Sequence, residues 1–337
     1  MSDVILPAYI EYLQQSGSYP HPATDVSMVQ THISFVLLAG DSVYKWKKPV
    51  DFGFLDFSTL DKRKYYCEQE LQLNRRLCPD LYKELVTVTR DGGGFCLNGS
   101  GEVVEYGIRM ARMDESRMMG RVMAAGELQK KHLDLIIDQL VPFYQEAAGG
   151  DEIKKFGRAK SVAVNVLENF EQTESFVDNG AVTRNQFEKI VCYSKEFLGH
   201  EDHFQKRIDA GKIRDCHGDM HSGNICLSDP VYIFDCIEFN ERFRYTDVAA
   251  DVAFLAMDLD FHGQAELSDY FVEQFVEKSG DRGLLGMLNF YKCYRTYVRA
   301  KIALFTASDP AVDEKTKATC IEQAKKHFLL AERYATT

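Results

Sequence analysis

Residues 217–224 read HGDMHSGN, and a turn, SDP at 228–230, then leads into the apolar segment VYIF and Asp235. Transfer of a phosphoryl group from a nucleotide needs a carboxylate that orients the attacking hydroxyl and further oxygen ligands that hold Mg²⁺. Asp219 suits the first role as catalytic base. Asn224, five residues later on the same loop, and Asp235, at the end of a strand, suit the second. This stretch therefore predicts a phosphoryl-transfer centre.

The order and spacing resemble the kinase pattern His-Arg-Asp-x-x-x-x-Asn followed by a metal-binding Asp. Gly218 stands in place of the Arg, and His221 replaces the Lys found two residues after the base. Both departures are typical of the aminoglycoside phosphotransferase and choline kinase superfamily, which the chain resembles over about residues 25–305. The segments FDCIEFNERFR (234–244) and DVAAD (247–251) are most similar to an uncharacterised bacterial branch, often fused to a P-loop ATPase domain. No P-loop motif occurs in the chain, so we expect that second domain to be absent.

The resemblance implies an α+β, bilobal protein-kinase-like fold that uses ATP and Mg²⁺. Residues 1–112 would form the nucleotide-binding lobe, with a small antiparallel sheet. Residues 113–337 would form a larger, mainly helical lobe with the catalytic loop and the acceptor site. The resemblance further implies that His217 supports the catalytic loop and that Asp251 accepts hydrogen bonds behind it. His221 would contact the transferring phosphate or simply support the loop.

The nucleotide lobe needs a lysine on a strand to bind the α- and β-phosphates and a glutamate on a nearby helix to hold it. Lys45 and Lys47 alternate along one strand, so both side chains share a face. Lys45 fits better, because Val43 would then cover the adenine. Glu70 is the expected partner, with Glu68 as the alternative. The remaining predicted nucleotide contacts are Ser34, in the loop that covers the phosphates, and Met110 and Met113, where the chain passes between the lobes.

Local patterns predict the elements around these residues. Val29–Ala39 and Val43–Lys47 flank Gly40-Asp41 and are typical of a β-hairpin. A helix is expected over Thr59–Leu77, capped by Ser58. The triplet Asp51-Phe52-Gly53 matches the metal-binding motif of protein kinases, but it precedes the catalytic loop, so we interpret it as a loop.

Two groups of charged residues in the second lobe have open interpretations. Lys292, Arg295 and Arg299 share one face of a helix expected over 284–306, where exposure to solvent or pairing with acidic neighbours is the simplest explanation. An acidic group could suit a cationic acceptor or could be exposed helix surface; its members are Asp258, Asp260, Glu266 and Asp269.

Composition narrows the classes of partner and of compartment. The 337 residues carry a net charge of −11, which argues against a general nucleic-acid binder. No apolar run is long enough to span a membrane, and nine cysteines without a Cys-x-x-Cys pair favour the cytoplasm over a disulfide framework. A hydroxyl-bearing small molecule is the expected acceptor. A protein kinase is the first alternative, although no Ala-Pro-Glu activation segment occurs. A non-catalytic nucleotide-binding module is the second.

Overall fold

The structure, a computed structural model, describes residues 6–337, which divide into two compact units. The first contains the residues up to Met118 and a later segment, Ile225–Asn240, and the second contains Met119–Asn224 and Glu241–Thr337. The sequence placed one boundary after residue 112 and assigned 225–240 to the second lobe.

The segment 225–240 belongs with the first unit because of its hydrogen bonds. The Cys78 thiol donates to the carbonyl of Ile233 at 3.3 Å, and the amide of Cys236 donates to Asn74 Oδ1 at 2.9 Å. Both contacts join residues that are more than 150 positions apart in the chain. No local sequence pattern predicts contacts between residues so far apart in the chain.

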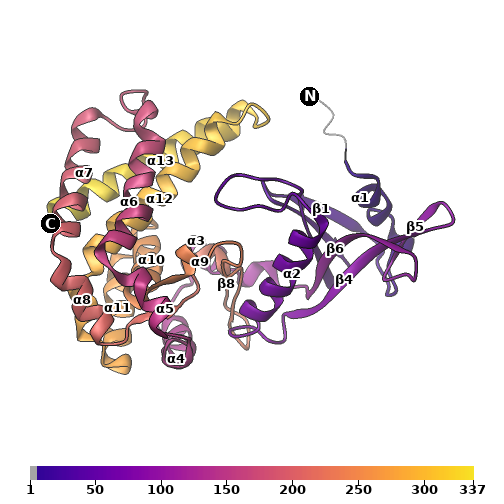
Figure 1. Cartoon of the computed structure of the whole chain (residues 1–337), viewed down its shortest axis with the longest axis horizontal. Helices are drawn as coiled ribbons and strands as arrows, with labels where there is room; N and C mark the ends of the chain where they lie inside the picture. The colour runs from indigo at the N-terminus through magenta and orange to yellow at the C-terminus, as the bar shows by residue number, and fades with distance from the viewer. Residues whose placement is uncertain (1–5) are drawn as a thin grey trace. The chain divides into compact units, whose positions relative to one another are not determined.

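The first unit is built on a six-stranded antiparallel sheet in the order β1-β2-β3-β6-β4-β5 (Figure 1). Its strands are β1 (Val26–Gln30), β2 (Ser34–Ala39), β3 (Ser42–Lys47), β4 (Tyr82–Asp91), β5 (Gly94–Leu97) and β6 (Glu102–Ala111). A separate two-stranded ladder joins β8 (Ile225–Cys226) to β9 (Tyr232–Ile233).

One strand prediction was wrong, because 29–39 is not continuous. The chain turns between β1 and β2, where Thr31 Oγ1 accepts the amides of Ile33 and Ser34 at 3.3 and 2.9 Å. Such a side-chain bond to nearby backbone offers an alternative to the ladder. The apolar residues on both sides of the turn hid it from a reading based on composition.

Two helices accompany the sheet, α1 (Ala8–Leu13) and α2 (Leu60–Asn74). Helix α2 packs on β4 and β6, and Thr59 caps it by accepting the amide of Lys62 at 3.3 Å. The predicted cap, Ser58, instead donates its hydroxyl to Asp56 at 2.6 Å. The side chain one residue further on therefore satisfies the open amide.

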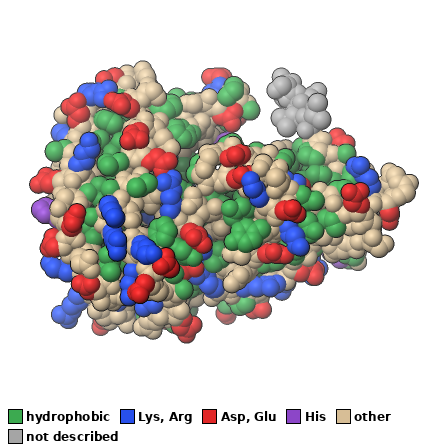
Figure 2. All heavy atoms as spheres, viewed as in Figure 1, with side chains coloured by type: hydrophobic (Ala, Val, Ile, Leu, Met, Phe, Trp, Pro, Cys, Tyr) green, Lys and Arg blue, Asp and Glu red, His purple; other side chains and the backbone are tan. Residues whose placement is uncertain are grey.

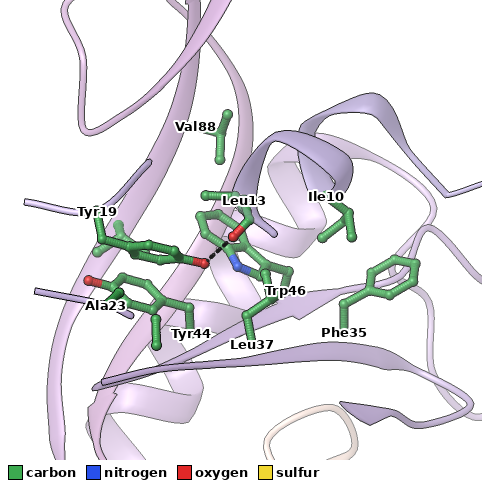
Figure 3. Close-up of a cluster of buried hydrophobic side chains, with 11 residues drawn as sticks. Ile10, Leu13, Tyr19, Ala23, Phe35, Leu37, Tyr44, Trp46 and Val88 are labelled. Atoms are coloured by element: carbon green, nitrogen blue, oxygen red, sulfur yellow. Dashed lines mark hydrogen bonds between the residues drawn. The ribbon is translucent and has the colours of Figure 1, made fainter. Parts of the chain in front are cut away.

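A cluster of buried side chains fixes α1 to the sheet (Figure 3). Trp46 of β3 lies fully buried beneath Ile10 and Leu13 of the helix. Tyr19 follows the helix in the chain, and its hydroxyl donates to the carbonyl of Leu13 at 2.5 Å. Burial of these large side chains stabilises the unit, at about 1.5–3 kcal/mol for each. Because Trp46 stands between Lys45 and Lys47 on the opposite face of β3, its burial directs both lysines to the other side.

The second unit is mainly helical (Figure 1). Its helices are α3 (Met119–Ala124), α4 (Lys130–Glu146), α5 (Asp151–Lys154), α6 (Ala159–Thr173), α7 (Arg184–Gly199), α8 (Glu201–Asp209), α9 (Glu241–Arg244), α10 (Val248–Phe261), α11 (Ala265–Ser279), α12 (Leu288–Ser308) and α13 (Glu314–Thr336). A short antiparallel ladder joins β7 (Ile213–Asp215) to β10 (Tyr245–Asp247). This ladder positions the start of the predicted catalytic loop, since residues 217–224 begin two positions after the last residue of β7.

Two features relevant to possible partners are the distribution of charge on the surface and the apolar character of the helices. On the face drawn in Figure 2, Lys and Arg side chains are interspersed with Asp and Glu rather than gathered in one patch. Within residues 6–337, no helix combines the length and the apolar character that crossing a membrane requires.

A buried histidine joins α12 to α13 and to the end of α10. The His327 ring stacks on Phe261 with centroids 3.8 Å apart, and its Nδ1 lies 3.0 Å from Thr296 Oγ1. Burial, together with the nearby charge of Arg299, lowers the pKa of His327 to about 3. The folded protein therefore keeps this ring neutral.

We expect His327 to make the protein less stable in mild acid. Its folded-state pKa lies below the unfolded value of about 6.5, so its contribution is complete above that pH and is lost progressively as the pH falls toward 3. Between pH 6 and pH 4.5 the free energy of unfolding should fall by about 1.4 kcal/mol per pH unit from this group. His327→Gln should flatten the slope measured by urea denaturation, whereas the exposed His200→Gln should not. An unchanged slope in His327→Gln would contradict a neutral buried ring.

Candidate active site

The centre of the first unit is a buried glutamate shared by two lysines. Glu70 Oε1 lies 2.8 Å from Lys45 Nζ, and Glu70 Oε2 lies 2.6 Å from Lys47 Nζ. Helix α2 presents Glu70 to the face of β3 from which both lysines project. One carboxylate thus holds both lysines that the sequence offered as the phosphate-binding residue. Glu68, the alternative partner, is exposed on the other side of the helix.

The two lysines differ in what they contact beyond Glu70. Lys45 Nζ lies 2.6 Å from Asp235 Oδ1, and this aspartate side chain is 46% exposed. Lys47 instead forms an ion pair with Glu238, and only 1% of the Lys47 side chain is exposed. Lys45 therefore connects the buried cluster to an accessible carboxylate, whereas Lys47 is enclosed on all sides.

The backbone at Asp235 is held in an unusual conformation. Its φ angle is +62°, in the left-handed region that aspartate tolerates better than most residues. Three groups hold the segment there: the Asp235 amide donates to the Tyr82 hydroxyl at 3.3 Å, the next amide donates to Asn74, and Lys45 binds the carboxylate. Strain of this kind costs about 1–3 kcal/mol and is typical of functional positions.

The charges in this cluster are strongly coupled. Burial by itself would lower the pKa of Lys45 and Lys47, but the adjacent carboxylates outweigh it and raise both values. Burial would raise the pKa of Glu70, and the two ammonium groups overcome that effect and lower it to about 2. Burial keeps the pKa of Glu238 raised. With Asp235, three carboxylates face two ammonium groups, so the fully ionised cluster carries an excess negative charge.

An apolar cluster lies beside these charges. Val43 pairs with Met110 across β3 and β6, and both belong to a cluster that includes Met113 and Phe234. Among the described residues, the amide and carbonyl of Met113 form no hydrogen bond. Ser34 is buried, and its hydroxyl has no hydrogen-bond partner within residues 6–337. The predicted nucleotide contacts thus include an apolar surface and unused polar groups.

The second unit holds the predicted catalytic loop, residues 217–224, in which Asp219 is the central residue. Asn224 Nδ2 donates to the carboxylate Oδ2 and to the carbonyl of Asp219, both at 2.9 Å. The His221 Nε2 lies 3.4 Å from the same carboxylate oxygen. His217 is fully buried, and its Nδ1 accepts the Asp219 amide at 3.3 Å. Hydrogen bonds within the loop thus hold both the side chain and the backbone of Asp219 in place.

Two carboxylates of α10 hold the backbone of this loop. Asp251 accepts the amides of His217 and Gly218 at 2.7 and 3.0 Å, as the sequence led us to expect. Gly218 has a φ of +88°, a conformation that side-chain-bearing residues rarely adopt. Two turns further along the same helix, Asp258 accepts the amide of Ser222 at 2.9 Å. One rigid helix therefore fixes both ends of the loop.

Electrostatics keep Asp219 ionised. Burial alone would raise the pKa of its carboxyl group, but the neighbouring His221 and the positive charges around it, including Arg299, outweigh that effect and lower the pKa. A carboxylate that stays ionised at neutral pH can accept a hydrogen bond from a hydroxyl group. The arrangement fits a residue that orients an attacking alcohol.

The predicted site residues fall into two groups, one in each unit. Lys45, Glu70 and Asp235 come together in the first. Asp219, His221, His217 and Asn224 come together in the second. Asp51, the rejected match, lies exposed in a loop, where its carboxylate accepts the amide of Gly53 at 2.9 Å.

Sequence reasoning missed the role of three residues that hold these groups in place. Asn74 and Asp258 stand one and two turns from Glu70 and Asp251 on the same helix faces, and that spacing was a usable signal. Glu238 had no such signal, because it pairs with a lysine from a distant strand.

Residues 179–284 match the family described as "Phosphotransferase enzyme family". Uncharacterized proteins of Mycobacterium tuberculosis and Mycobacterium bovis are 32% identical over 319 residues, covering 93% of this chain and 61% of each relative. The chain thus spans about three fifths of the length of the curated relatives it matches.

Two solved structures share the fold. A putative aminoglycoside phosphotransferase from Ralstonia eutropha aligns with a TM-score of 0.51 at 10% identity, covering 98% of this chain and 96% of that one. Amicoumacin kinase in complex with AMP-PNP and Ca²⁺ aligns with a TM-score of 0.52 at 12% identity, covering 96% of this chain and 93% of that one. At these identities the likeness concerns the fold alone.

The different surroundings of the two lysines predict different costs of removal. Lys47→Met should lower the free energy of unfolding by about 3–5 kcal/mol, because it leaves Glu238 buried without a partner. Lys45→Met should cost clearly less, since Glu70 keeps Lys47 and Asp235 is open to solvent. Urea denaturation of the matched pair measures the difference. Equal losses would show that the two lysines are not distinct in their roles.

Proposed function

We propose that this chain is a kinase that transfers the γ-phosphate of ATP to a hydroxyl group of a small molecule. Its α+β, protein-kinase-like fold and the match of residues 179–284 to the phosphotransferase family support the proposal, and both agree with the resemblance to the aminoglycoside phosphotransferase and choline kinase superfamily. The observation that carries the proposal is the position of Lys45 between Glu70 and Asp235. In that arrangement Lys45 would bind phosphate, Glu70 would be its helix partner and Asp235 would bind the metal, the three roles that such chemistry requires.

The nucleotide would bind to groups of the first unit. Lys45 would bind the α- and β-phosphates, because its ammonium is held in place yet contacts an exposed carboxylate. The unbonded backbone of Met113 would recognise the adenine edge, and Val43 and Met110 would cover its ring. The amicoumacin kinase structure with bound AMP-PNP supports ATP as the donor.

The donor groups present are suited to Mg²⁺. Asp235 offers an exposed carboxylate, and Asn224 donates its amide nitrogen to Asp219 and leaves its amide oxygen unbonded within the described chain. No cluster of three or more His, Cys, Asp or Glu side chains that could hold a metal ion occurs within residues 6–337. Mg²⁺ commonly needs only one or two carboxylates, since water and nucleotide phosphates complete its shell. When bound, the ion would neutralise charge on the phosphates.

Asp219 would act on the acceptor. Its carboxylate would accept a hydrogen bond from the acceptor hydroxyl and take the proton as the oxygen bonds to the γ-phosphorus. The bond between that phosphorus and the bridging oxygen of the β-phosphate would break, and ADP would leave. Asn224 donates to the Asp219 carboxylate and His217 accepts the Asp219 amide, so both hold Asp219 in place before the acceptor arrives. His221, adjacent to the same carboxylate oxygen, would contact the transferring phosphate. The protein thus contributes mainly position and charge, as is usual in phosphoryl transfer.

A matched pair of variants separates nucleotide binding from chemistry. Asp235→Asn keeps the side-chain shape but removes the charge, and should abolish the magnesium-dependent rise in melting temperature caused by ATP. Asp219→Asn should keep that rise and lose about 10²–10⁴-fold in turnover, the usual contribution of a positioned base. Scanning fluorimetry with and without Mg²⁺ and release of labelled phosphate from ATP provide the readouts. Wild-type turnover in Asp219→Asn would remove Asp219 as the base, and no ATP response in the wild type would refute the nucleotide site.

A further inference from the structure

Three cations lie along one side of α12. Lys292, Arg295 and Arg299 follow one another at spacings of three and four residues, which places them on one face of a helix. All three are buried or half-buried in the second unit. A buried cation is retained at low cost only if it has a partner, so the partner of each is informative.

Two of the three cations are used inside the protein. Lys292 Nζ lies 2.9 Å from Asp260 Oδ2 and 3.1 Å from Ser268 Oγ. Arg295 donates from Nε to the carbonyl of Ala250 at 3.3 Å, and its guanidinium lies over the Phe254 ring. These contacts bind α12 to α10 and α11, so both cations have structural roles.

Arg299 is the remaining cation, and it has no such role. It forms no hydrogen bond and no ion pair within residues 6–337. Its charge nevertheless acts on two groups of this unit, because it lowers the pKa of both Asp219 and His327. A guanidinium with five donors is thus unused near the predicted catalytic carboxylate.

The contacts around Arg299 connect it to the catalytic loop. One turn earlier on α12, Arg295 lies over the Phe254 ring, and His221 is also a neighbour of that ring, at a centroid distance of 5.3 Å. His221 in turn lies next to the Asp219 carboxylate. The face of α12 that carries Arg299 therefore borders the residues that would receive the acceptor.

The carboxylates of the same region are already occupied. Asp258 accepts the Ser222 amide, and Asp260 accepts from Lys292 and from the Tyr334 hydroxyl at 2.5 Å. Glu266 and Asp269 are exposed on α11. The acidic residues that suggested a cationic acceptor are therefore either bonded within the protein or in contact with solvent, and the unused charge near Asp219 is positive.

We propose, resting on the proposed kinase function, that Arg299 binds an anionic group of the acceptor, so that the substrate is a small hydroxy compound that carries a carboxylate or a phosphate. Arginine recognises both groups through two parallel hydrogen bonds. The acceptor would place its hydroxyl at Asp219 and its anionic group at Arg299. This assigns Arg299 to substrate binding and selectivity rather than to the transfer itself.

Matched acceptors test this assignment: glycerate, glycerol 3-phosphate and glycerol, and gluconate, glucose and glucosamine. Each is supplied to the full chain with labelled ATP and Mg²⁺, and binding without nucleotide is followed by scanning fluorimetry. We expect the acidic members to be bound and phosphorylated in preference to neutral and cationic ones. Arg299→Gln should reduce kcat/KM for them about 10- to 100-fold, the effect of losing one charge-assisted contact. Lys301→Gln, which removes a cation of the same helix that contacts Gln172 and the Phe305 ring, should have no effect.

The outcomes distinguish this inference from the kinase proposal. Arg299→Gln should lower turnover of the acidic members more than it lowers hydrolysis of ATP with water as the acceptor, because water carries no anionic group. An equal loss in both reactions would place Arg299 on the transferring phosphate and overturn the inference. Preference for neutral or cationic members, or no selective binding of the acidic ones, would also overturn it while leaving the kinase proposal intact. A wild type that neither binds nor hydrolyses MgATP refutes the kinase proposal alone, because nucleotide-free binding of the acidic members still reports on Arg299.

Discussion

Glu70 lies fully buried between two ammonium groups, and the arrangement of the first unit depends on this shared carboxylate. Burial of several charges is costly unless each one has a close partner of opposite sign. Glu70 meets that condition for Lys45 and Lys47 together and so connects α2 to β3. Through the two lysines it also connects the sheet to Asp235 and Glu238, in a segment that enters this unit from much later in the chain.

Both units fix a functional loop in the same way, with polar side chains on one face of one helix. In the first unit, Glu70 and Asn74 of α2 hold the segment that contains Asp235. In the second, Asp251 and Asp258 of α10 accept amides of the catalytic loop. A helix is stiff, so side chains one or two turns apart keep a constant separation. Each loop thereby acquires a defined shape without regular secondary structure of its own.

The sequence was informative where chemistry and local spacing coincide. The 217–224 motif and the pairing of a strand lysine with Glu70 followed from residue type and order, and the structure brings each set together. Contacts between distant segments were not accessible, because nothing in the neighbourhood of Glu238 reports a lysine on β3. The turn at Thr31 escaped notice for a different reason, since one hydroxyl group interrupts a segment whose composition is that of a strand.

The hydrogen bonds between α10 and the predicted catalytic loop affect how the loop responds to heating. Its inward face supplies the unit's core as well as Asp251 and Asp258, and nearly every residue of this helix is buried. The loop cannot loosen unless those hydrogen bonds break, and they cannot break without disturbing the core. Order in the loop and folding of the second unit therefore form one cooperative transition. On heating, the loop should keep its geometry up to the temperature at which the whole unit melts, with no earlier stage of inactivation.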